Sequence, residues 1–277
     1  MPQHDAWKVL SAGDRPEVVL AVDFDVTGRP EARFTDLAPM LKTGASLWES
    51  LPPAAGTETG MTGESYLDRW HQGLGAQLPE VRAVFGYCVG GVYAAELAAR
   101  VARTQERSPL VVLFDPEPST GPTLFWQFHK VMEFMRSVAT DEEITAAQEA
   151  GRIAESGTTD LGTLCERLVD LFRQTGEVAF ARAGLDEIRR TELFATFSSF
   201  MTYLSAAGRY DALARWSSAV AITSISPTSG LNGIRAHLPG SEHELVSREI
   251  RVQVEHAELL RSDEVASVVN DLLLELS

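Results

Sequence analysis

Cysteine is scarce in this 277-residue sequence, which contains only Cys88 and Cys165. Two cysteines exclude a disulfide framework, and the lack of histidines and carboxylates at ligand spacing around them excludes a zinc-type site. The sequence also lacks an apolar run long enough to cross a membrane, and residues 1–5 lack the basic and apolar segments of a signal peptide. We therefore expect a protein of the reducing cytoplasm with no membrane partner, no metal and no bound cofactor.

Positive charge is also in deficit. The 24 lysines and arginines are outnumbered by 39 aspartates and glutamates, which gives a formal net charge of −15. Because the phosphates of a nucleic acid would be repelled by such a surface, we exclude nucleic acid as a partner. Hydrophobic residues make up 44% of the chain, which suffices for one sizeable core or for a core with an inserted subdomain.

Short apolar stretches alternate with helical patterns in residues 1–121 and again in residues 217–277. This alternation predicts an α/β core, a mostly parallel sheet with helices on both faces. The longest apolar stretches have the uniform hydrophobicity of strands that are buried on both sides. The expected strands are 17–26, 45–48, 84–87, 110–114, 219–225 and 249–254, and the last helix is expected at 263–276.

Residues 122–216 show helical periodicity and no convincing strand. We expect this segment to be a helical insertion, a lid over one end of the sheet, between the two halves of the core. Its phenylalanines and methionines, at helical spacing, are typical of ordinary packing, although as a group they would also suit an apolar substrate channel. Cys165 shares the apolar face of one such helix and is expected in its core.

One motif carries chemistry, the run Gly86-Tyr87-Cys88-Val89-Gly90-Gly91 between a predicted strand and a predicted helix. It has the form of the nucleophile elbow Gly-x-Ser-x-Gly with cysteine at its apex. The glycines allow strand and helix to pass closely, and the positive end of the helix dipole favours a thiolate at Cys88. The alternative is a glycine-rich turn that carries a buried, unreactive cysteine.

A thiol nucleophile requires a base for its proton, and His256 has the position expected of that base. It directly follows the predicted strand 249–254, and functional groups of parallel sheets gather at the carboxyl ends of strands. The other five histidines are expected on helical patterns, ahead of the last strands or in a polar loop: His4, His71, His129, His237 and His243.

The acid that orients this histidine is expected to be Asp115, which follows the strand 110–114. An aspartate before a proline is also a common turn former, so a purely structural role is the alternative. The competing position, after the strand 219–225, offers only the uncharged run 226–230. Asp23 and Asp25 lie at the end of the first core strand. The loop that follows this strand is expected to supply backbone N–H donors for an oxyanion rather than the acid of the triad.

Acyl transfer also requires backbone N–H groups that bind the oxyanion of a tetrahedral intermediate. One donor is expected to be Val89, the residue after the nucleophile. The other is expected from the loop after the first core strand, with Val26 as the first choice and Thr27 as the next.

With these residues in place, the chain resembles the α/β-hydrolase thioesterases of nonribosomal peptide and polyketide assembly lines. The likeness rests on the elbow at Cys88, on Asp115 27 residues later, on His256 before the last helix, and on the helical segment between acid and histidine. It implies an α/β-hydrolase fold with a lid, a pantetheine thioester on an acyl or peptidyl carrier protein as substrate, and release by hydrolysis, cyclisation or aminolysis. The cysteine nucleophile and the acidic Asp23-Phe24-Asp25 loop depart from that family, which tends to have prolines in this loop.

Two alternatives stay open. The elbow is also similar to the Gly-x-Cys-x-Gly-Gly elbow of dienelactone hydrolases, which implies a hydrolase of small lactones or esters. That family lacks a large lid and carries its acid after the later strand, where this chain has Ser226-Pro227. The second alternative is a binding protein with an inactive site on the same scaffold.

Overall fold

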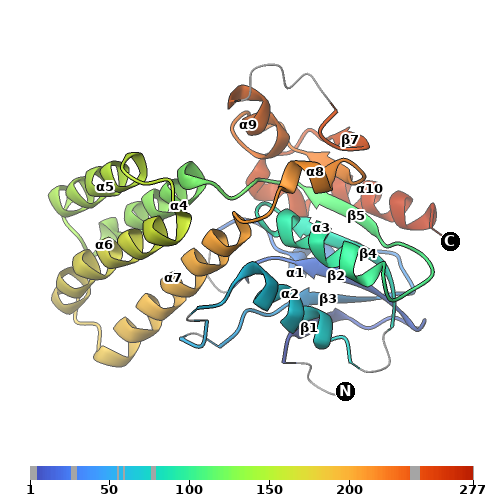
Figure 1. Ribbon diagram of the computed structural model, residues 1–277, viewed down its shortest axis with the longest axis horizontal. Coiled ribbons are helices and arrows are strands. Elements are labelled where there is room, and N and C mark those ends of the chain that lie inside the picture. Colours follow the sequence, from blue (N-terminus) through green and yellow to red (C-terminus); the bar gives the residue numbers. More distant parts are fainter. Residues whose placement is uncertain are drawn as a thin grey trace. The chain divides into compact units, whose positions relative to one another are not determined.

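In the part of the chain that the structure describes, the strands form one seven-stranded sheet. The computed structural model describes residues 5–25, 30–54, 56–58, 60–75, 79–237 and 244–276. Among these residues the strands lie in the order β1-β3-β2-β4-β5-β6-β7, with β1 antiparallel to β3 and all other neighbours parallel (Figure 1). The strands are β1 (Trp7–Ser11), β2 (Glu17–Val22), β3 (Ser46–Ser50), β4 (Glu80–Tyr87), β5 (Leu110–Phe114), β6 (Val220–Thr223) and β7 (Arg248–Arg251).

Helices cover both faces of this sheet. One face is packed by α1 (Phe34–Leu37), η2 (Ala38–Met40), η4 (His256–Arg261) and α10 (Asp263–Leu274). The other face is packed by α3 (Gly90–Val101), and the helices α2 (Gly63–Gln72) and α8 (Ala212–Trp216) contact α3 in turn. A further helix, α9 (Gly230–His237), lies next to β6. The expected α/β architecture is confirmed.

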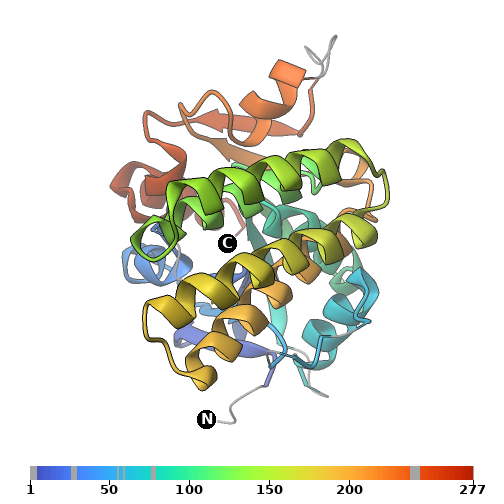
Figure 2. The same ribbon diagram turned by 90° about the vertical axis from the view of Figure 1, so that its left-hand side faces the viewer.

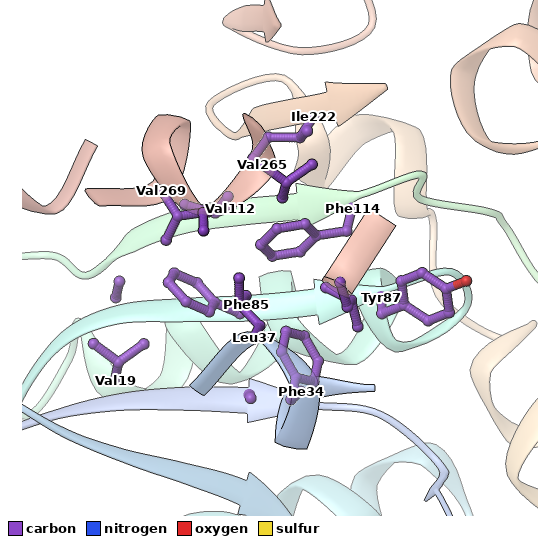
Figure 3. Close-up of a cluster of buried hydrophobic side chains, with 14 of the residues drawn as sticks. Val19, Phe34, Leu37, Phe85, Tyr87, Val112, Phe114, Ile222, Val265 and Val269 are labelled. Atoms are coloured by element: carbon purple, nitrogen blue, oxygen red, sulfur yellow. The ribbon is translucent and has the colours of Figure 1, made fainter. Parts of the chain in front are cut away.

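The core between the sheet and α1 and α10 is built around aromatic rings (Figure 3). Phe85 and Phe114 from neighbouring strands contact each other edge to face, and both contact Phe34 of α1. All three side chains are fully buried. Because side chains alternate along a strand, β4 directs Phe85 and Tyr87 to this core and Gly86 to α3.

The remaining residues form a second compact unit of helices. Residues 1–52, 63–118 and 210–277 make up the sheet unit, and residues 53–62 and 119–209 make up the helical unit. In Figure 2 the long helices of the helical unit are seen along their length, with α6 and α7 side by side. The helices are α4 (Gly121–Phe134), η3 (Met135–Ser137), α5 (Asp141–Ser156), α6 (Leu161–Arg182) and α7 (Glu187–Ala207).

Local signals set the beginnings of these helices. Each of the four long helices follows a residue whose side chain accepts a backbone N–H of the first turn, namely Thr120, Thr140, Asp160 and Asp186. Apolar side chains then pack between the helices, as in the contact of Phe172 with Phe197 at a ring distance of 4.3 Å. Cys165 is buried, as expected, and so are most of the phenylalanines and methionines of residues 122–216.

The observed units differ from the expected division in two segments. Residues 210–216 belong to the sheet unit, because Trp216 of α8 is fully buried there and its indole N–H donates to the Gly91 carbonyl at 3.0 Å. Residues 53–62, expected in the core, belong to the helical unit. That the helical unit acts as a lid stays a prediction.

Two elements of the sheet unit were not expected. The first is the short edge strand β1. The second is α9, which begins in a run rich in proline, glycine and serine, so that His237 is the last residue of a helix rather than part of a loop. Neither segment has an apolar pattern long enough to indicate its structure. None of the described helices is both long enough and apolar enough to span a membrane.

Candidate active site

Cys88 lies at the apex of the turn between β4 and α3. Its backbone has a φ of 51°, in the left-handed region that non-glycine residues rarely adopt. The conformation is held by the Cys88 N–H, which donates to the Phe114 carbonyl at 3.0 Å, and by the Cys88 carbonyl, which accepts from Gly91 N–H at 3.0 Å and from Glu117 N–H at 3.2 Å. The side chain is partly exposed. The geometry is that of a nucleophile elbow.

The glycines of the motif are required by close packing. A Cβ atom at Gly86 would lie 2.6 Å from the Gly91 Cα atom, and one at Gly90 would lie 2.2 Å from the Val22 carbonyl oxygen. Both distances are far below van der Waals contact. The start of α3 is thereby held against the carboxyl ends of β4 and β2.

Asp115 lies one residue beyond the neighbouring strand β5, as predicted. The sheet ladder continues to this residue, because its N–H donates to the Ile222 carbonyl at 3.0 Å, and its φ is 42°. The side chain is fully buried. Its Oδ1 accepts the Ser224 N–H at 2.9 Å, and its Oδ2 lies 2.9 Å from Nδ1 of His256. The structure thus brings together the predicted acid and the predicted base.

His256 is the first residue of η4 and is fixed from several sides. Its N–H donates to Ser226 Oγ at 2.9 Å, and Ser226 in turn donates to the Glu255 carboxylate. The Tyr87 ring stacks on the imidazole at a centroid distance of 5.0 Å. The Tyr87 hydroxyl lies 3.0 Å from Nε2 and 3.1 Å from the His256 carbonyl oxygen. With Nδ1–H directed to Asp115, Nε2 is the nitrogen available to accept a proton.

Glu117, which is not among the predicted site residues, contacts the thiol. The Cys88 side chain donates a hydrogen bond to the Glu117 carboxyl group. The same carboxyl group accepts the Gly230 N–H, at the start of α9, over 3.4 Å. Burial, mainly, and the charge of Asp115 raise the pKa of Glu117, while His256, Gly230 and Cys88 act in the opposite direction. A sequence signal existed, because Glu117 is a second carboxylate at the end of a core strand, in Asp115-Pro116-Glu117-Pro118.

The predicted oxyanion donors are only partly described. Val89 is the N-cap residue of α3, so its N–H has no carbonyl partner within the helix. Val26 and Thr27 lie outside the described residues. Earlier in the same loop, the Asp23 N–H donates to Ser50 Oγ at 3.2 Å and the Phe24 N–H to Asp23 Oδ1 at 2.7 Å. The N–H groups of Asp23 and Phe24 therefore already donate hydrogen bonds within the protein.

Three carboxylate side chains lie near the end of β2. Asp23 is buried, Asp25 forms an ion pair with Arg33 at 3.0 Å, and Glu49 of β3 is only 1% exposed. Lys8 Nζ lies 3.6 Å from the Glu49 carboxylate. Burial, first, and the charges of Asp23 and Asp25 raise the pKa of Glu49 to about 7.

Glu49→Gln is expected to stabilise the protein in alkaline solution. The pKa of Glu49 is higher in the folded chain than in the unfolded chain, so the protonated carboxyl group stabilises the fold fully below its ordinary pKa of 4.5. This stabilisation is lost as the pH rises to about 7. The loss is on the order of 3 kcal/mol. Urea unfolding should therefore show Glu49→Gln close to wild type at pH 4.5 and more stable at pH 8. Exposed Glu166→Gln is the control, and equal pH dependence of all three proteins would contradict the expectation.

The second cysteine is unsuited to catalysis. Burial, mainly, raises the pKa of Cys165 to about 11, so its thiol stays protonated at neutral pH. Within the described ranges, no three histidine, cysteine or carboxylate side chains are grouped so that they could hold a metal ion.

Comparison with known proteins reveals similarity only at the level of structure. No protein-family model and no curated protein sequence matches the chain. The Vlm2 thioesterase domain bound with a dodecadepsipeptide matches with a TM-score of 0.52 and 15% identity, over 96% of this chain and 97% of that domain. The NocB thioesterase domain, in covalent complex with a fluorophosphonate nocardicin G analogue, matches with a TM-score of 0.53 and 16% identity, over 96% of this chain and 99% of that domain.

The chain has the α/β-hydrolase fold. An acetylester hydrolase from Corynebacterium glutamicum matches with a TM-score of 0.51 and 12% identity, over 98% of this chain and 88% of that one. A four-domain nonribosomal peptide synthetase bound to AMP and glycine matches with a TM-score of 0.55 and 10% identity, over 98% of this chain but only 20% of that one. At these identities the similarity concerns the fold, and the activity must be argued from the site.

Proposed function

We propose that the protein is a thioesterase or acyltransferase of nonribosomal peptide or polyketide assembly, with Cys88 as nucleophile, His256 as base and Asp115 as the acid that orients it. The observation that carries the proposal is the pairing of Asp115 with His256 at 2.9 Å, one strand away from a cysteine in the strained conformation of a nucleophile elbow. The substrate is an acyl or peptidyl group on the pantetheine thiol of a carrier protein.

The first step is a thioester exchange. The Cys88 sulfur attacks the acyl carbon and its proton passes to His256, while the bond from the acyl carbon to the pantetheine sulfur breaks and that sulfur receives the proton. The N–H groups of Val89 and of Val26 bind the oxyanion in between. The product is an acyl thioester on Cys88, almost as reactive as the substrate. Water, an amine or a hydroxyl group then attacks the acyl carbon and gives its proton to His256, while the bond to the Cys88 sulfur breaks and that sulfur regains the proton.

The position of the acid favours this proposal over a lactone hydrolase. Asp115 comes from the end of β5. The described residues between β6 and β7 contribute the Ser224 N–H and the Ser226 hydroxyl, but no carboxylate, to Asp115 and His256. The fold similarity to the Vlm2 and NocB thioesterase domains supports the same choice. A carrier protein is accordingly the proposed partner.

The proposal is tested by mass spectrometry of the intact protein after incubation with a short acyl-pantetheine thioester. We expect an acyl adduct that maps to Cys88, is absent in Cys88→Ala and persists longer in His256→Ala, because the second step then lacks its base. Cys165→Ser is the matched control and should behave as wild type.

Turnover of free lactones without any reaction with thioesters would favour the lactone hydrolase. An acyl group on a residue other than Cys88 would overturn the assignment of the nucleophile. No adduct and no turnover with any activated acyl donor would indicate a binding protein.

A further inference from the structure

The thiol of Cys88 has a carboxyl partner that the triad does not require. Glu117 lies two residues beyond Asp115, and its carboxyl group accepts the hydrogen bond of the Cys88 side chain. Its backbone is fixed to the same residue, because the Glu117 N–H donates to the Cys88 carbonyl at 3.2 Å. Cys88 and Glu117 thus contact each other through both their side chains and their main chains.

We propose that Glu117 keeps the Cys88 thiol protonated while the site is empty. A carboxylate beside a thiol opposes ionisation of the sulfur, because two negative charges at hydrogen-bond distance repel each other. The thiolate is the form that is alkylated and oxidised, so a protonated thiol is protected between turnovers.

Three fixed groups keep the Glu117 carboxyl in place and favour its ionised form. The Gly230 N–H at the start of α9 donates to Oε1 at 3.4 Å, the imidazole of His256 interacts with it favourably, and the thiol donates to it. Burial, which has the largest influence, and the charge of Asp115 act against ionisation, and on balance the pKa of Glu117 is raised. The Cys88 thiol therefore contacts Glu117, which lies beyond the end of β5, and it precedes the N-terminal end of α3.

These groups shift the pKa of the Cys88 thiol in opposite directions, so a measurement of that pKa tests the proposal. The start of α3 and a protonated His256 lower the pKa of a thiol, whereas an ionised Glu117 raises it. If the helix and the histidine dominate, Cys88 reacts as an activated cysteine with a pKa below about 8.5. If Glu117 dominates, Cys88 reacts more slowly than an ordinary thiol at pH 8.

The test is the pH profile of Cys88 alkylation by iodoacetamide, followed by intact mass. In this reaction the thiolate sulfur forms a bond to the reagent carbon and iodide leaves, so the rate measures the thiolate fraction. We expect half-maximal alkylation above pH 8.5 in the wild type. In Glu117→Gln the midpoint should fall by about one to two pH units, and the rate at pH 8 should rise about tenfold.

Glu192→Gln is the matched control, because the Glu192 side chain is exposed on α7 and its loss should leave the profile unchanged. Glu117→Asp keeps the charge on a shorter side chain and should lie between Gln and wild type. A wild-type midpoint below pH 8.5 would overturn the proposal without any variant. A Glu117→Gln protein that is alkylated at the same rate as wild type, or more slowly, would overturn it as well. The inference takes from the proposed function only that Cys88 is the nucleophile. Alkylation requires no acyl substrate, so the proposal and the thioesterase assignment can fail separately.

Discussion

Replacing Cys88 by serine is expected to lower kcat/KM for an acyl-pantetheine thioester about 10²-fold and to change the slow step. A hydroxyl group is a weaker nucleophile than a thiol at neutral pH and needs His256 as base throughout its attack. The acyl-enzyme would then be an oxygen ester, which is less reactive than the thioester on Cys88. We therefore expect it to accumulate, as a burst of free pantetheine followed by slow release of the acyl group.

Cys88→Ala provides the comparison, because it removes the nucleophile altogether and should lower turnover on the order of 10⁴-fold or more. Free pantetheine is measured with a thiol reagent, and the acyl-enzyme by intact mass. Equal activity of the alanine and wild-type proteins would exclude covalent catalysis by Cys88. A serine variant without a burst would show that its first step stays slow.

Asp115→Asn is expected to lower kcat about 10³- to 10⁴-fold while the fold persists. The reason lies in the Ser224 N–H, which donates to Asp115 Oδ1 at 2.9 Å. An asparagine would keep its oxygen at this donor and direct its NH₂ group to Nδ1 of His256. Nδ1 would then have to accept a hydrogen bond, so the proton would move to Nε2, and Nε2 could no longer accept the proton of the thiol.

Steady-state kinetics and the ¹⁵N chemical shifts of His256 test this prediction together. The shifts should report the exchange of tautomers, which a general loss of stability would not produce. Exposed Asp271→Asn, on α10, serves as the control for the substitution itself. A variant with the wild-type tautomer and the wild-type rate would remove Asp115 from the proposed mechanism.

Much of the fold and part of the site were predictable, because their signals are local. Strand, turn and helix around Cys88 are contiguous in the sequence, and the glycines that permit their contact lie within six residues. Asp115 and His256 could be inferred from a general rule, that side chains directly after parallel strands meet at one edge of the sheet. Their contact at 2.9 Å agrees with that rule.

Other parts of the site escaped prediction for physical reasons. The sequence indicates Tyr87 only as a residue of the elbow, yet its ring and hydroxyl contact His256, which is 169 residues away. In the sequence Ser226 indicates only that no carboxylate follows β6 at this position, whereas in the structure its hydroxyl accepts the backbone N–H of His256. Such contacts depend on the directions of side chains from separate strands, and sequence spacing does not encode these directions.

The sequence by itself determined the α/β class and the cysteine at the elbow, because hydrophobic periodicity and close glycine packing act over short distances. Only the tertiary structure decided which groups surround the thiol. Strand pairing places Asp115 beside Cys88, and α9 and η4 then position Gly230 and His256 around Glu117. Long-range packing, rather than the motif alone, thus determines the electrostatic environment in which Cys88 ionises.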